Sequence, residues 1–135
     1  MVDRREFLKL AGATAALALA GCSSPQLSSN EVKVAKDVND TYQESSIGNA
    51  AASGALVLAS KISKRPLKEI EDLYKTTSST FNAEAAAILV LGSIISGANI
   101  EELEKFYQNQ SQLNSVANAY LAAADAIETS QLKSK

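Results

Sequence analysis

The stretch AEAAAILVLGSIISG, residues 83–97, decides the fold because it is the most apolar of the helical segments. Asn82 precedes it and can cap a helix N-terminus, and Gly97 closes it with the residue most common just after a helix C-terminus. Ser93 and the early Glu84 interrupt the run, which leaves its apolar part short of the ~20 residues that a membrane span needs. We therefore expect a helix buried at the centre of a helical domain, with a membrane span as the alternative.

Two helical segments lie nearest the N-terminus of the predicted helical domain. From Asn30 onward, Val34, Val38 and Tyr42 recur every four residues and form one narrow apolar stripe. Residues 47–62, IGNAAASGALVLASKI, are apolar and carry Gly and Ala at three- and four-residue spacings. Small residues at these spacings lie on one helix face and allow a neighbouring helix to approach closely.

Three more segments complete the helical pattern. Proline suits the first turn of a helix, so we expect a helix to start near Pro66, with Glu71 among the charged residues of its polar face. After Gly97, Asn99 followed by Glu102 resembles a capping box and predicts another helix start. Residues 113–127 repeat apolar positions as a final amphipathic helix. No stretch alternates with period two for long enough to indicate a sheet, so the predicted class is all-α, a small bundle of four to five short helices.

The N-terminal residues have the layout of a bacterial export signal. Residues 3–9, Asp-Arg-Arg-Glu-Phe-Leu-Lys, resemble the twin-arginine (Tat) motif Ser/Thr-Arg-Arg-x-Phe-Leu-Lys, and the residues at its fixed positions are Arg4, Arg5, Phe7, Leu8 and Lys9. The apolar run that follows, residues 10–20, would span about 17 Å as a helix, too short for a bilayer core of about 30 Å. The resemblance implies export of the chain by the Tat translocase. A generic signal of the Sec type with two arginines is the alternative.

The apolar run ends in Leu-Ala-Gly-Cys at residues 19–22, which resembles the lipobox of bacterial lipoproteins. This resemblance implies that lipoprotein-processing enzymes attach lipid to Cys22 and cleave the chain before it; an incidental thiol is the alternative. Residues 23–29 are small and polar with one proline, as in a flexible linker. We therefore divide the chain into a cleaved signal peptide (1–21), a lipidated cysteine with a flexible tether (22–30) and a helical domain (31–135).

Composition narrows the classes of function for the processed chain. Cleavage removes three of the 13 basic and two of the 15 acidic residues, which leaves 10 and 13 and a net charge of −3. No basic patch stands out, so we expect no binding to nucleic acid. Cys22 is the single cysteine, so no disulfide within the chain is expected.

The residue types that carry most catalysis are scarce. The chain has no histidine, and lipidation would consume its one thiol. Glu101, Glu102 and Glu104 crowd the start of one predicted helix, where the helix dipole favours negative charge, and a calcium site needs more converging oxygens than this run offers. No glycine-rich phosphate loop, haem motif or iron–sulfur spacing occurs. We therefore predict a non-enzyme with no catalytic residues, no metal site and no cofactor.

Residues 55–65, ALVLASKISKR, resemble a pattern in the small subunits of membrane-associated, FAD-dependent sugar and alcohol dehydrogenases of the sorbitol type. That pattern reads Phe-Leu-x-Leu-Ser-x-x-Leu-Thr-Gly-Arg, then Leu, then a helix ending near Leu-Tyr, and this chain continues with Leu67 and with Leu73-Tyr74. Lys64 replaces the glycine, and the family's later Trp-Tyr segment is missing because the chain has no tryptophan. The resemblance implies a helical accessory subunit with a flavin dehydrogenase large subunit as its partner.

Two functions therefore remain open. The first is a non-catalytic accessory subunit that escorts and membrane-anchors a Tat-exported oxidoreductase. Its expected partner interface is the small-residue face around Ala55 and Ala59, with Lys61, Lys64 and Arg65 as a polar rim. The second is a free-standing structural or binding lipoprotein. Both place the protein in the cell envelope, on the periplasmic side, anchored by lipid to the inner or the outer membrane.

Overall fold

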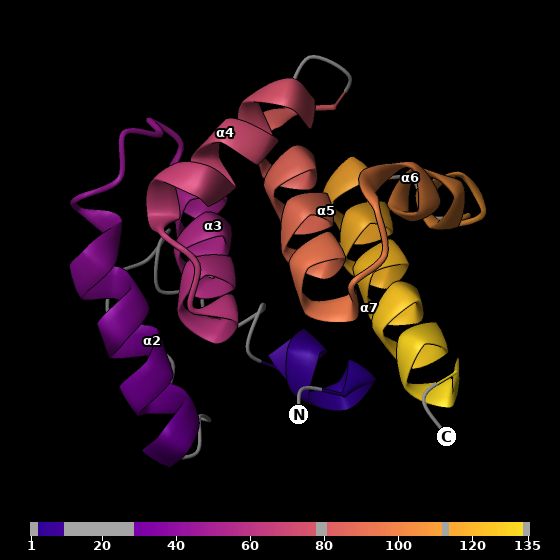
Figure 1. The fold of residues 1–135 in the computed structure, drawn as a ribbon, viewed down its shortest axis with the longest axis horizontal. Helices are drawn as coiled ribbons and strands as arrows, with labels where there is room; N and C mark the ends of the chain where they lie inside the picture. The colour runs from indigo at the N-terminus through magenta and orange to yellow at the C-terminus, as the bar shows by residue number, and fades with distance from the viewer. Residues whose placement is uncertain (1–2, 10–28, 78–80, 112–113, 134–135) are drawn as a thin grey trace.

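Past residue 28, the described part of the chain forms six helices, and residues 4–9 form a short helical segment before them (Figure 1). The structure is a computed structural model that describes residues 3–9, 29–77, 81–111 and 114–133. The helices are α2 (Ser29–Tyr42), α3 (Ala50–Ser63), α4 (Leu67–Thr77), α5 (Ala83–Ser96), α6 (Ile100–Gln108) and α7 (Ser115–Lys133). The predicted all-α class is confirmed. The expected number of four to five helices is too low, because each of the six periodic segments forms a separate helix.

Helix α5 lies at the centre of the fold, between α3 and α7 (Figure 1). It also contacts α4 and α6, so four of the other helices pack against it. Every residue from Ala85 to Gly92 is buried. The stretch that decided the predicted fold therefore forms the centre of the core, as expected.

Capping residues fix where several helices begin and end. Asn82 Oδ1 accepts a hydrogen bond from the Ala85 amide at 2.8 Å, and Asn99 Oδ1 accepts one from the Glu102 amide at 2.9 Å. Gly97 closes α5 with a φ of 79°, in the left-handed region that favours glycine. The three caps expected from the sequence are confirmed.

Helix α3 begins at Ala50, three residues later than the expected start at Ile47. The Asn49 side chain caps it by accepting from the Ala52 amide at 3.0 Å, and the buried Ser53 hydroxyl donates to the Ile47 carbonyl at 2.6 Å. These two bonds hold the residues before Ala50 in a turn instead of a further helical turn.

The outer boundaries also differ from those expected. Helix α2 begins at Ser29, so the helical domain starts two residues before the predicted residue 31. Helix α7 continues to Lys133, six residues past the expected end at Ile127. The expected anchor Cys22, the predicted tether up to residue 28 and the apolar position Leu113 lie outside the described residues.

Membrane spans were the alternative for the central segment. Among the residues described, no single helix has both the length and the apolar character to cross a membrane. Helices α5 and α6 reach both limits only when taken together, and the chain bends by 119° between them.

Candidate functional site

The segment with the twin-arginine resemblance packs against the helical domain. Residues 4–9 form a helix whose Phe7 side chain is only 1% exposed and belongs to the main hydrophobic core. The Phe7 ring lies 6.5 Å from the ring of Tyr120 on α7, measured between centroids, and the two planes are tilted by 53°. Complete burial of a side chain of this kind typically contributes about 1.5–3 kcal/mol relative to leaving it exposed.

Arg4 lies next to two carboxylates of α7. Its Nη1 donates to Asp125 Oδ1 and lies 3.5 Å from Glu128 Oε2. The other oxygen of the Asp125 carboxylate accepts a hydrogen bond from Gln110 Nε2 at 2.8 Å. Gln110 follows α6, so Asp125 is bonded both to the N-terminal helix and to the α6–α7 connection.

The helical spacing sorts the five predicted signal residues into two groups. Arg4 and Phe7 are three residues apart, so they lie on one face and meet α7. Arg5, Leu8 and Lys9 are exposed, with Leu8 at 36%. The structure therefore divides the two arginines, one turned toward the domain and one toward solvent.

Asp3 caps this short helix. Its Oδ1 accepts from the Glu6 amide at 2.8 Å, and its carbonyl accepts from the Phe7 amide at 2.8 Å. The twin-arginine motif has Ser or Thr at this position, and both belong with Asp to the preferred N-cap residues. The departure from the motif at Asp3 thus keeps the capping oxygen.

The prediction of a partner interface on α3 is wrong for its two central residues, Ala55 and Ala59. Ala55 is 7% exposed and Ala59 is 0% exposed, because α2, α4 and α5 pack around α3. The small residues serve close packing within the domain and present no face to a partner. Lys61, Lys64 and Arg65 are exposed at the end of α3.

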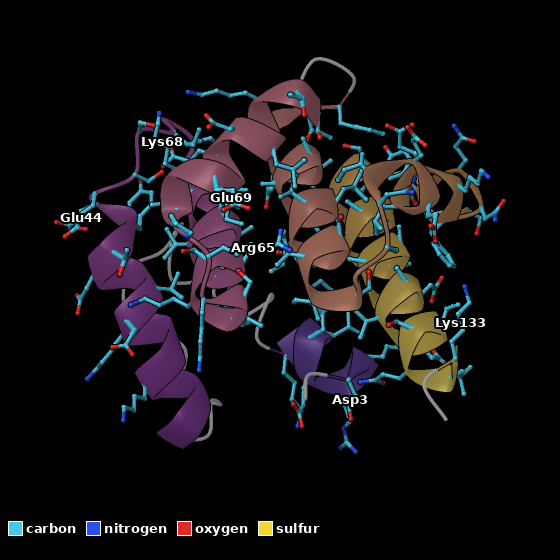
Figure 2. All side chains as sticks on the ribbon, viewed as in Figure 1. Asp3, Glu44, Arg65, Lys68, Glu69 and Lys133 are labelled. Carbon is cyan, nitrogen blue, oxygen red and sulfur yellow. The ribbon has the colours of Figure 1, made fainter. Side chains whose placement is uncertain are left out.

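The α3–α4 turn carries that basic cluster. Arg65 Nη1 lies 3.9 Å from Glu69 Oε1, and both side chains are open to solvent (Figure 2). Lys64 has a φ of 61° and a ψ of 23°, the left-handed conformation in which glycine is favoured at a helix end. The dehydrogenase small-subunit pattern has its glycine at this position.

Few titratable side chains are buried in the described parts of the chain. Glu71 is 8% exposed, although the sequence placed it on the polar face of its helix, and its Oε2 accepts a hydrogen bond from the Ser46 hydroxyl. Burial, and to a lesser degree the nearby Glu84 carboxylate, raise the pKa of Tyr120 to about 12. Burial also raises the pKa of the Tyr74 hydroxyl above its ordinary value.

No arrangement for metal binding is found among the described residues, where no three Cys, His, Asp or Glu side chains group together. Among the open surface grooves of the described residues, one is lined by Arg4, Leu8 and Glu128, and two others have no lining residue from the N-terminal helix. The first of these two, of about 290 Å³, lies between the end of α5, α6 and the last turns of α7, and Glu102, Phe106 and Lys133 line it. The hydroxyl groups of Ser96, Thr129 and Ser130 also belong to its lining. The second lies between α4 and α5 and is lined by Arg65, Glu69 and Ile94, among others.

No protein-family model, curated protein or solved structure matches the chain.

The contact between residues 4–9 and α7 could not be read from the sequence. In the sequence, Arg4 and Phe7 belong to the predicted export signal, and no role is assigned to Asp125 or Glu128. The spacing offers one hint: Asp125 lies near the end of the predicted final helix and Glu128 follows three residues later, the same separation as that of Arg4 and Phe7. Pairing them requires knowledge of which helices become neighbours.

Proposed function

We propose that this chain is an exported, lipid-anchored helical protein of the cell envelope that acts by binding and not by catalysis. The observation that carries the proposal is the position of the single cysteine, Cys22, directly after a short apolar run and the small residues Ala20 and Gly21. A cysteine thiol there is suited to alkylation by a diacylglyceryl group. One acyl chain gives only marginal membrane binding, whereas two or three chains give stable anchoring.

Further support comes from the way in which the buried polar groups are used. Glu71 bonds to Ser46 and Ser53 bonds to the Ile47 carbonyl, so both hold loop residues against helices. The tyrosines with a raised pKa are kept neutral, which suits packing better than proton transfer near neutral pH. These arrangements favour a stable scaffold over a catalytic cleft.

A second candidate is the accessory subunit that escorts an oxidoreductase. The observation that favours it is the twin-arginine resemblance in a chain with no histidine and one cysteine. The Tat route carries folded cargo, so a signal of this kind suits a chain that travels with a partner bearing a cofactor. Because Ala55 and Ala59 are buried, the partner surface in this proposal moves to the exposed end of α3 with Lys61, Lys64 and Arg65.

The lipid anchor is tested by Cys22→Ala in the full chain, with Ser23→Ala as the matched control. Metabolic labelling with palmitate should mark the wild type and the control but not Cys22→Ala. The variant should also accumulate as an uncleaved or mislocalised precursor. Labelling that persists in Cys22→Ala would contradict the proposal.

The escort is tested by replacing both Arg4 and Arg5 with lysine and following the chain together with whatever co-purifies with it. A redox enzyme without a signal of its own should then remain in the cytoplasm beside the variant. If the variant still reaches the periplasm, or if no redox enzyme co-purifies with the wild type, the escort function fails. The free-standing lipoprotein would then be the remaining proposal.

A further inference from the structure

The face of α7 that meets residues 4–9 combines an aromatic surface with two carboxylates. Tyr120 supplies the ring against Phe7, and Asp125 and Glu128 supply the acceptors around Arg4. We propose that this face is a docking site for the chain's own export-signal helix, residues 4–9, so that the folded domain covers Arg4 and Phe7 until the signal is drawn away. This inference rests on the proposed function only in naming residues 4–9 an export signal.

Burial and charge play different parts in the docking. Phe7 is almost fully enclosed, so its removal from water supplies most of the affinity. Arg4 and Asp125 are 36% and 32% exposed, and an ion pair this open to solvent adds less. The pair instead helps to fix the direction of the docked helix, because it holds Arg4 at the carboxylates while Phe7 lies against Tyr120.

A residue of the helical domain, Gln110, holds the Asp125 carboxylate that accepts the hydrogen bond from Arg4. Gln110 Nε2 bonds Asp125 Oδ2 and also the Phe106 carbonyl at 3.2 Å, which fixes the carboxylate against the end of α6. This arrangement leaves Oδ1 for the arginine. None of these groups belongs to residues 1–21, so removal of the signal would leave the face in place and open.

Docking on α7 limits the access of a translocase to the export signal. A translocase that recognises both arginines finds Arg5 exposed and Arg4 engaged on α7. Docking and recognition are therefore mutually exclusive for Arg4, and weakening the α7 face should release the signal without altering it.

Protection of the N-terminal helix from trypsin tests the docking in the purified full chain. Cleavage after Arg5 and Lys9, followed by mass spectrometry, reports the undocked population when opening is fast relative to cleavage. Phe7→Ala should raise the cleavage rate by more than about tenfold, since it removes the buried ring. Leu8→Ala, its exposed neighbour, is the matched control and should leave the rate within a factor of about two.

Changes on α7 test the same contact from the other side. Asp125→Asn combined with Glu128→Gln should raise the cleavage rate about two- to fivefold. The control is Glu44→Gln, because Glu44 is exposed near the end of α2 and lies away from Asp3 at the N-terminal helix (Figure 2). Gln110→Ala tests whether a disturbed α6–α7 connection is enough to expose residues 4–9 to trypsin. If its cleavage rate equals that of the Asp125→Asn, Glu128→Gln double variant, the role given to the two carboxylates is overturned.

Fluorescence gives a second measurement, because the chain has no tryptophan. Phe7→Trp should emit at shorter wavelength than Leu8→Trp, and the difference should shrink when Asp125 and Glu128 are neutralised. Equal emission from the two tryptophans together with unprotected Arg5 in the wild type would overturn the docking site. Lipid labelling of Cys22 is independent of both measurements, so failure of the docking and failure of the proposed function can be told apart.

Discussion

Gly92 of α5 lies directly against Ala123 of α7. A Cβ atom placed on Gly92 would come within 2.5 Å of the Ala123 Cβ and within 2.8 Å of its Cα, and 3.1 Å from Leu103 Cδ1. The Cα belongs to the backbone and cannot turn aside as a flexible side chain does. The contact between α5 and α7 therefore requires that the residue at position 92 have no side chain.

Gly92→Ala should destabilise the protein by about 1–3 kcal/mol, since the added methyl group must separate α5 from α7. Alanine is favoured over glycine inside a helix by about 1 kcal/mol, so a net loss would show that the overlap outweighs propensity. Urea unfolding followed by circular dichroism measures the change. Gly48→Ala is the control because nothing lies within 4 Å of a Cβ at Gly48. An unchanged midpoint for Gly92→Ala would contradict the close contact.

Leu89→Ala should cost about 2–5 kcal/mol, because Leu89 is 0% exposed in the middle of the central helix and its truncation leaves a cavity. Domains of this size are typically stable by only about 5–15 kcal/mol, so the loss will be clear in denaturant unfolding. Leu132→Ala removes the same atoms from a side chain that is 64% exposed and should change the midpoint little. Equal effects of the two changes would show that α5 is not the core helix.

Asn82→Ala should cost about 0.5–2 kcal/mol, because the Asn82 side chain caps α5 through the Ala85 amide. Its Nδ2 also donates to the Ser115 hydroxyl at 2.5 Å and so joins the starts of α5 and α7. Asn82→Asp keeps a capping oxygen and loses the donor to Ser115. It should therefore recover most of the stability in thermal unfolding, and a loss as large as that of the alanine variant would assign the effect to the Ser115 bond.

Periodicity and capping residues predicted most of the fold. Asn82, Gly97 and Asn99 act locally, through amides and dihedral angles within four residues, so their roles can be read from a short stretch. The burial of Ala85–Gly92 was also predictable, because this part of the segment has no polar face to turn toward solvent.

Features that depend on neighbouring helices were not predictable in the same way. The small residues around Ala55 and Ala59 correctly indicated close packing, but the sequence does not say whether the close neighbour is another helix of the chain or a partner. Glu71 was placed on a polar helix face, yet it is buried because the loop with Ser46 covers it. The docking of Phe7 depends on a contact across more than a hundred residues, which no local pattern reveals.

Tyr120 should make the stability of the full chain fall with rising pH in the alkaline range. Burial and then Glu84 raise its pKa from 10.0 to about 12, so between these values the unfolded chain has lost the phenolic proton while the folded chain keeps it. The contribution is complete below pH 10 and is lost as the pH rises toward 12, at a rate of at most about 1.4 kcal/mol per pH unit.

The test compares urea unfolding of the wild type and Tyr120→Phe at steps across this window. Phenylalanine cannot ionise, so the difference in unfolding free energy between the two proteins should change with pH at the rate expected for the loss of one proton. The lysines titrate alike in both proteins, so their contributions to this difference cancel. Glu84→Gln removes the neighbouring negative charge and should shift the tyrosinate absorbance assigned to Tyr120 to lower pH. Parallel stability curves for the wild type and Tyr120→Phe would show that Tyr120 ionises equally readily in the folded and unfolded chain, and that its ring is not enclosed between Phe7 and the domain.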